Sequence, residues 1–509
     1  MLWLNQAFAA LECSTLYISQ KMKYTSTILL TLPAFIGVRF AQAAPPDEKW
    51  KNMNVLFIQA DQHRYDCIGY SGHSQAKTPH LDQLARQGIT FQSSYSCIPT
   101  SCPARQSLLS GYWPERHKGL WNYDITLPVT SFTGPTWTQE LAKQDLKMGY
   151  VGKWHVHPSK DPRHFGFDDY ISEQDYNRWR KKQGISDYVS QDSMWAMGGY
   201  DPAPKESTRT HWLARKAVEL IGRYQADGKQ WHVRLETSDP HLPCYPVREF
   251  LQMYSPQDIP EWGNYHDTFE NKPYIQQQQI YNWRLEDTDW SLWQGYLQRY
   301  FANITQLDDA IGMVLSELEE MGVLDNTIIV YTSDHGDAAG SHNMVDKHYV
   351  MYEEVTHVPL IIKLPGVQPK NIRAFVNNQL DMAATFCQLY HLNYQTQGES
   401  LFPLILTENA TDTWRKYAFS NYNGQQFGLY VQRMIRGERF KYVWNMTDVD
   451  ELYDLQDDPW ELKNLIKEEA YSEELRILRK ELYDDLKKRK DPLVWQDATK
   501  RQLLENMKL

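Results

Sequence analysis

Four short apolar runs, each followed by a cluster of polar residues, stand out along this chain. Each has the length of a buried strand, and helical patterns, such as those at 81–86 and 302–321, separate them. Strands that alternate with helices predict an α/β fold, in which a large, mixed but mostly parallel sheet is flanked by helices. The four runs cover residues 54–60, 148–151, 232–236 and 326–331.

The pattern changes after Pro365 and Gly366. Two short strands, expected at 427–434 and 440–444, precede an amphipathic helix. The change predicts a smaller C-terminal α+β domain at residues 371–509, which follows a larger α/β domain at 44–370. The apolar face of the expected helix carries Leu475, Leu478, Leu482 and Leu486.

Residues 160–300 contain a polar, aromatic-rich insertion, which is densest at 254–300. It is either a cap over a ligand site or a structural excursion that packs on the sheet, and the sequence leaves both open. The whole chain has 18 Trp and 32 Tyr. Such rings stack on sugar faces, although large cores also use them.

The N-terminal residues 1–43 have the pattern of an export leader. Two lysines around Met22 precede an apolar stretch at 27–38, and the Ala-Gln-Ala sequence at 41–43 is typical of a cleavage site. We expect a signal peptide whose true start is Met22, and therefore a periplasmic or secreted protein without stable membrane insertion. A transmembrane anchor is the alternative, but the apolar stretch is short for a membrane span.

The composition is that of an ordinary globular protein, with 42% hydrophobic and 23% charged residues. A net charge of −11 argues against a general nucleic-acid binder. It leaves room for an anionic ligand in a locally basic pocket. Five of the six cysteines lie beyond the expected leader, and their spacing does not indicate a disulfide framework.

Residues 101–111 read SCPARQSLLSG and predict a short helix with an anion site at its start. Pro103 suits the first turn of a helix, and Gly111 suits its end. Ser101 would then lie where free backbone N–H groups and the helix dipole favour negative charge. Arg105 adds a planar donor that is always charged. Taken alone, the segment is equally compatible with an ordinary surface helix capped by serine.

This segment resembles the signature of the sulfatase family, which belongs to the alkaline phosphatase-like superfamily. The resemblance implies that Ser101, in the serine-type motif, is the precursor of Cα-formylglycine (3-oxoalanine). It also implies a radical maturase that makes this residue. Cys97 is a competing nucleophile, but it lacks an arginine four residues later. The stretch 451–459 is similar to the C-terminal domain of the family, so the resemblance spans nearly the whole mature chain.

Polar residues that follow two of the expected strands form a metal-ligand set. Asp61, Gln62 and Asp334 offer oxygen atoms and His335 offers nitrogen, a set that points to Ca²⁺ or Mg²⁺. The resemblance adds the residue derived from Ser101 to this set. The family usually has two consecutive acids at the first pair, so Gln62 departs from its pattern. The amide oxygen can still coordinate, but one negative charge is lost.

The resemblance also implies the catalytic residues. Lys153 would hold a sulfate oxygen, and His155 would contact the nucleophile and act as a base. His241 would protonate the leaving oxygen as general acid. Lys347 would be the second sulfate-binding lysine, and Arg105 would stabilise the nucleophile.

These features predict an exported sulfatase similar to bacterial carbohydrate and glycosaminoglycan sulfatases. The expected substrate is a sulfated oligosaccharide, with a preference for a uronate 2-O-sulfate. One alternative is a phosphonate or phosphate ester hydrolase of the same fold, and another is a glycan-binding protein with an inert site. The candidate sugar contacts are His117, Lys118, Asn423 and Gln425.

Overall fold

The computed structural model describes residues 48–124, 132–191, 197–425 and 427–508. The predicted leader at 1–43, with its expected start and cleavage site, lies outside these residues. Within the described part of the chain, no helix combines the length and the apolar character that crossing a membrane requires.

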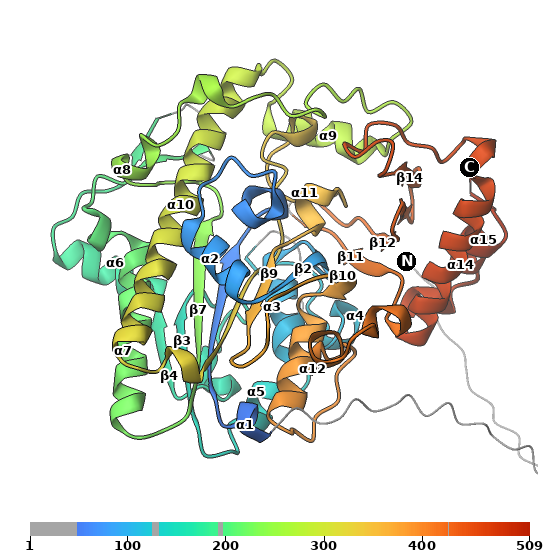
Figure 1. The fold of residues 1–509 in the computed structure, drawn as a ribbon. Coiled ribbons are helices and arrows are strands. Elements are labelled where there is room, and N and C mark those ends of the chain that lie inside the picture. The colour runs from blue at the N-terminus through green and yellow to red at the C-terminus, as the bar shows by residue number, and fades with distance from the viewer. Residues whose placement is uncertain (1–47, 125–131, 192–196, 426, 509) are drawn as a thin grey trace, which may run out of the picture. The chain divides into compact units, whose positions relative to one another are not determined.

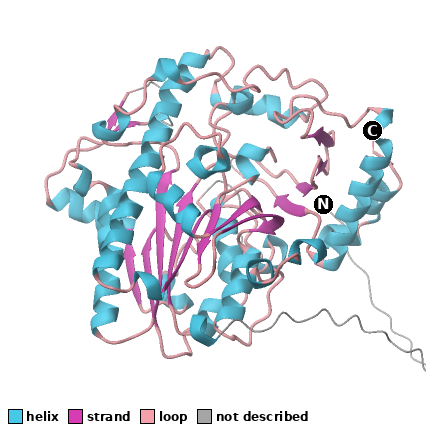
Figure 2. Cartoon of the chain, viewed as in Figure 1, coloured by secondary structure: helices cyan, strands magenta, loops and turns pink. Residues whose placement is uncertain are grey.

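An eight-stranded sheet forms the centre of the fold, as the alternation of apolar runs and helical patterns predicts (Figure 2). Of its strands, β9 alone runs antiparallel to both of its neighbours, so the sheet is mixed and mostly parallel. In spatial order the strands are β10 (Lys370–Asn377), β2 (Ile89–Tyr95), β9 (Leu360–Lys363), β8 (Thr327–Ser333), β1 (Asn54–Asp61), β7 (Trp231–Pro240), β3 (Lys147–Gly152) and β4 (Asp169–Ser172).

Helices cover both faces of this sheet, which is why β1 and β8 at its centre are buried at every position (Figure 1). Side chains of β1 alternate between two cores. Val55 and Phe57 pack with α5 (Trp137–Leu141) and α12 (Leu380–Leu389). Leu56 and Ile58 pack on the other face, against α2 (Pro79–Gln87), α7 (Arg209–Ala226) and α10 (Trp290–Glu320).

The aromatic-rich stretch at 254–300 is joined to the sheet by one helix of 31 residues, α10. The helical pattern at 302–321 covers only its second half. The first half is helical as well, because Trp293, Tyr296 and Tyr300 bury one face against the neighbouring loops. Before it lies α9 (Tyr274–Trp283).

A second sheet of four antiparallel strands lies in the C-terminal part, and α14 (Ser472–Lys488) and α15 (Asp497–Leu504) pack on it. The predicted leucine face of α14 is buried. The strand expected at 427–434 begins only at Gln432, because Gln425 and Gly428 form a hydrogen-bonded turn before it. The strands are β11 (Ala418–Tyr422), β12 (Gln432–Arg436), β13 (Phe440–Asn445) and β14 (Glu451–Asp454).

Short elements connect these layers. They are α1 (Glu48–Lys51), α3 (Ser101–Ser110), α4 (Pro114–His117), α6 (Glu173–Lys182), α8 (Arg248–Leu251), α11 (Glu353–Thr356), α13 (Phe402–Leu406), β5 (Val189–Ser190) and β6 (Gly199–Tyr200).

The four central strands β8, β1, β7 and β3 are parallel, so their carboxyl ends meet at one edge of the sheet. In the register, Ala60 pairs with Ser333, Asp61 with Pro240, and Gly152 with Glu236. The polar clusters that follow the predicted strands therefore converge, as expected for a site in an α/β fold.

Gly152, the last residue of β3, offers a test of this convergence. Its φ is +110°, and a Cβ atom there would lie 1.8 Å from the Glu236 carbonyl oxygen. Gly228 also has a positive φ, of +66°, but open space around it. We expect Gly228→Ala to lower the free energy of unfolding by about 1 kcal/mol, and Gly152→Ala by roughly 3 kcal/mol or more. Urea denaturation measures both, and equal losses would contradict the close strand approach.

Candidate active site

Ser101, the predicted nucleophile position, lies at the start of α3, as the sequence predicts. Ser101 is its first residue, and Gly111, with a φ of 70°, ends it in the left-handed conformation. Every residue of the helix is buried. The Ser101 hydroxyl thus lies at a buried helix N-terminus, facing the carboxyl ends of the central strands.

Arg105, one turn further along α3, binds three buried carboxylates. Its Nη2 lies 2.8 Å from Asp61 Oδ2, its Nη1 2.6 Å from Glu236 Oε2, and its Nε 3.1 Å from Asp334 Oδ2. Because both aspartates use Oδ2 for this contact, their Oδ1 atoms remain for other partners. Glu236 was missed by the sequence reasoning. An acid at the end of the expected strand 232–236 was the available signal, since a buried charge needs a partner.

The two Oδ1 atoms and His335 enclose a small space beside Ser101. Asp61 Oδ1 lies 3.5 Å from Ser101 Oγ and 3.8 Å from His335 Nε2, while Asp334 Oδ1 lies 3.6 Å from that nitrogen. His335 Nδ1 is 2.9 Å from the Gly336 carbonyl oxygen and donates to it, so Nε2 keeps its lone pair toward Ser101, 2.8 Å away. Three ligand atoms within 4.8 Å of one another fit a single cation.

The charges of this cluster also fit a cation. Burial raises the pKa of Asp61, but the Lys153 ammonium and its other cationic neighbours outweigh burial and hold the pKa well below the usual range. Burial and then the charge of Asp61 raise the pKa of Asp334 to about 7. The second carboxylate is therefore costly to ionise here, and a divalent cation between the two would remove that cost.

Gln62 adjoins the cluster, although its side chain has other partners. Its backbone N–H donates to Asp334 Oδ1 at 3.1 Å. Its amide oxygen accepts from Lys347 Nζ at 2.9 Å, and its amide nitrogen donates to Asp337 and Asp346. The latter two acids were also missed by the sequence reasoning, although they belong to the segments that supply His335 and Lys347.

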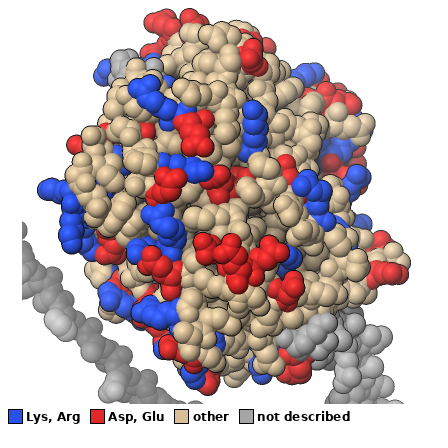
Figure 3. Space-filling view, turned by 60° about the vertical axis from the view of Figure 1, so that its left-hand side comes forward, with Lys and Arg blue, Asp and Glu red and all other residues tan. Residues whose placement is uncertain are grey.

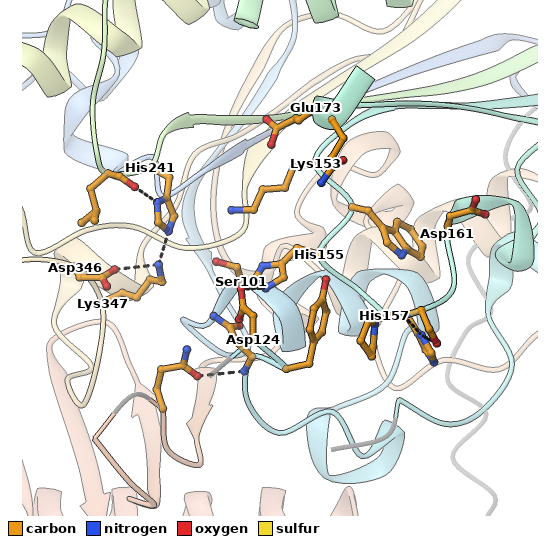
Figure 4. A pocket seen from close by; sticks show the side chains of 18 of the residues that line it. Ser101, Asp124, Lys153, His155, His157, Asp161, Glu173, His241, Asp346 and Lys347 are labelled. Carbon is orange, nitrogen blue, oxygen red and sulfur yellow. Dashed lines mark hydrogen bonds and ion pairs between the residues drawn. The ribbon is translucent and has the colours of Figure 1, made fainter. Parts of the chain in front are cut away.

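Two lysines and a histidine, Lys153, Lys347 and His241, lie around Ser101 (Figure 4). Lys153 Nζ lies 2.7 Å from Asp61 Oδ2, and Lys347 Nζ lies 2.9 Å from His241 Nε2. His241 Nδ1 donates to the Leu242 carbonyl oxygen, which leaves Nε2 to accept from Lys347. Burial, together with Lys347 and Lys153, lowers the pKa of His241 to about 3, so the free site holds a neutral imidazole.

These groups line a cavity of about 790 Å³, which is the size of a small-molecule site. His155 lies on its wall with a left-handed φ of 41°, and its Nε2 is 3.3 Å from Asp124 Oδ2. His155 lowers the pKa of Asp124 to about 2.

On the protein face drawn in Figure 3, acidic and basic side chains are interspersed rather than segregated.

Of the four candidate sugar contacts, Gln425 lies on the cavity wall. His117 is fully buried and bonds with Ser107 at 3.0 Å. Lys118 Nζ donates to the Glu115 carbonyl oxygen, and Asn423 donates to the Glu115 carboxylate. The described lining of the cavity does not include these three residues.

Two protein-family models match this chain. A family model described as Sulfatase matches residues 53–392, more than half of the chain. A second model, described as N-sulphoglucosamine sulphohydrolase, C-terminal, matches residues 340–489.

Curated relatives match along most of their length. The chain is 28% identical over 490 residues to an arylsulfatase of Clostridium perfringens (strain 13 / Type A), which covers 86% of this chain and 95% of the relative. It is 26% identical over 535 residues to an N-acetylglucosamine-6-O-sulfatase of Bacteroides thetaiotaomicron, at 92% and 91% coverage. A Δ4,5-hexuronate-2-O-sulfatase of the same organism is 27% identical over 466 residues, at 86% and 89% coverage.

Two solved structures share the fold. One holds its substrate, D-glucosamine-2-N,6-O-disulfate, and matches with a TM-score of 0.71 and 22% identity, over 88% of this chain and all of the other. The second is a phosphonate monoester hydrolase of Silicibacter pomeroyi, with a TM-score of 0.73 and 22% identity, at 86% and 96% coverage.

The carboxylate and histidine cluster leads to a metal prediction. We expect Ca²⁺ to stabilise the protein against heat, by about 2.7 kcal/mol at a hundredfold excess over its Kd. Asp334→Asn should abolish this gain, because it removes a charged ligand atom. Asp337→Asn changes a neighbouring buried acid outside the cluster and should keep the gain. Differential scanning calorimetry with and without Ca²⁺ measures this stabilisation. If Asp334→Asn were still stabilised by Ca²⁺, the assignment of Asp334 as a metal ligand would be contradicted.

Proposed function

Because this chain belongs to the sulfatase family and is a sulfuric ester hydrolase, we propose that it removes sulfate from a saccharide, with Ser101 as the nucleophile position. One observation carries this proposal. The Ser101 hydroxyl, at a buried helix N-terminus, contacts His335 at 2.8 Å beside two carboxylates, and Lys153 and Lys347 stand on either side. Relatives that act on sulfated glucosamine and hexuronate support a saccharide.

Two groups that the chain itself does not supply belong to the proposal. Oxidation of Ser101 to Cα-formylglycine by a radical maturase would supply a hydrated aldehyde as nucleophile, and a Ca²⁺ or Mg²⁺ ion would offset the negative charge of nucleophile and sulfate. Asp61, Asp334 and His335 would hold the ion together with position 101. Gln62 stays a proposed ligand, although its amide oxygen accepts from Lys347 in this structure.

The two lysines and Arg105 have different tasks. Lys153 and Lys347 border the cavity, so their ammonium groups, which contact Asp61 and His241 in the free site, can also bind sulfate oxygens when the ester enters. Arg105 is enclosed by its three carboxylates and acts by orienting Asp61 and Asp334 toward position 101.

Two histidines handle the protons. His241 holds its Nδ1 proton on the Leu242 carbonyl group, so Nε2 is the atom that delivers a proton to the leaving alcohol. In the free site this nitrogen accepts a hydrogen bond from Lys347, and the negative charge of a bound sulfate ester would raise the pKa of His241 so that Nε2 carries the proton. His155, paired with Asp124, is the proposed base that takes a proton from position 101 when sulfate is released.

The proposed substrate is a sulfated glycosaminoglycan oligosaccharide, with a preference for a uronate 2-O-sulfate, and the proposed location is the periplasm or the outside of the cell. Gln425 is the remaining candidate for a sugar contact on the cavity wall. The leader pattern and the aromatic content of the chain support these two points.

The decisive experiment compares ester classes on enzyme that was made with and without the maturase. Mature protein should hydrolyse sulfated disaccharides and aryl sulfates in preference to matched phosphate diesters. A preference for the diester would replace the proposal with phosphonate or phosphate ester hydrolysis, the chemistry of one structural neighbour. Inert protein with unmodified Ser101 from its native host would favour a glycan-binding role.

Ser101 itself gives a second prediction. Protein made without the maturase, and the Ser101→Ala variant, should bind a sulfated sugar but not turn it over, because neither has the aldehyde. Intact-mass analysis should show oxidation of Ser101 in the active preparation only. Turnover by protein with an unmodified Ser101 would overturn this chemistry.

The role of His241 predicts a dependence on the leaving group. His241→Asn should lower kcat for a sugar sulfate by roughly 10²- to 10⁴-fold, because an alkoxide leaves poorly without a proton. A nitrophenyl sulfate, whose leaving group needs no proton, should lose far less. His164→Asn, an exposed histidine outside the cavity, is the control. Equal losses on both esters would exclude His241 as the general acid.

A further inference from the structure

A second, smaller cavity adjoins the first, and we propose that it binds a second sugar residue, attached to the one that carries the sulfate. This proposal rests on the proposed function. The second cavity measures about 330 Å³, at the lower end of the range for small-molecule sites. Lys153, His241 and Leu242 line both cavities, so the two spaces meet at the lysine and the general acid.

The place of His241 determines what can enter the second cavity. Its Nε2 delivers the proton to the ester oxygen, which belongs to the alcohol and not to the sulfate. The saccharide is therefore on the side of His241 when the bond breaks. A group that extends past His241 into the second cavity is part of the saccharide, and the volume suits a single ring.

Two tyrosines on the wall of this cavity form a stacked pair. The Tyr188 and Tyr245 rings are 4.8 Å apart at an interplanar angle of 20°. They come from different segments, one before β5 and one after β7. Arg180 packs over Tyr188 at 4.3 Å and is itself held by two 2.8 Å contacts with Asp201. Arg180 and Tyr245 occupy the faces of Tyr188, so Tyr245, supported by this stack, is the ring that suits the apolar face of a sugar.

The charged groups on the wall are already balanced. Arg209 Nη2 lies 2.8 Å from Asp239 Oδ1, and its Nε lies 3.5 Å from Glu173, which faces the first cavity. Lys153 is paired with Asp61. Because no charge of either sign is in excess among the described lining residues, the cavity favours an uncharged, hydroxyl-rich ring over a second anionic group. Thr208, Ser238 and Gln306, which are uncharged and polar, also line the cavity.

The experiment measures binding rather than turnover, so that it does not depend on maturation. Calorimetry on the Ser101→Ala protein gives the Kd of a sulfated disaccharide with an uncharged second residue, and of the matching sulfated monosaccharide. We expect the disaccharide to bind more tightly. Tyr245→Ala, added to Ser101→Ala, should reduce this advantage by roughly threefold to tenfold, the worth of an aromatic contact.

Tyr274→Ala is the matched control, because Tyr274 is 65% exposed on α9 and lines neither cavity. It should leave the ratio of the two Kd values unchanged. Equal affinity for mono- and disaccharide, or a ratio that Tyr245→Ala does not alter, would overturn the second subsite. Hydrolysis of aryl sulfates by the mature enzyme would then still support the proposed function, so the two failures are distinguishable.

Discussion

The contact between Arg105 and three carboxylates is the interaction on which the site depends. Asp61 ends β1, Glu236 lies in β7, and Asp334 follows β8, so one guanidinium joins three neighbouring strands. Burying three like charges together is prohibitive without such a partner. The planar, forked donor groups also decide which oxygen of each aspartate faces His335.

A chain of hydrogen bonds connects this cluster to the acid side of the cavity. Gln62 accepts from Lys347, and Lys347 donates to His241. The amide nitrogen of Gln62 donates to Asp337 and Asp346, which fixes the orientation of the side-chain amide. Gln62, which departs from the family pattern, thus joins the proposed metal site to the proposed general acid. A carboxylate at this position could also accept from Lys347, but it would add a negative charge.

Much of the local structure was predictable because local rules govern it. Pro103 and Gly111 mark the beginning and end of α3, and the apolar runs mark the strands whose carboxyl ends carry the site. Other features escaped prediction. Asp124 approaches His155 from a loop 31 positions earlier in the numbering, and Glu236 meets Arg105 across the sheet. Neither spacing nor periodicity encodes such meetings, because they depend on strand order.

The sequence by itself determined the fold class, the family and the identity of the polar residues, since strand and helix patterns and the motif around Ser101 are properties of short segments. The tertiary structure decided which of these residues meet. It buried His117 and Asn423 away from the cavity, placed Gln425 on the cavity wall, and set a second cavity beside His241. The physical reason is that the parallel order β8-β1-β7-β3 brings distant strand ends to one edge, whereas side chains that find partners elsewhere are packed away.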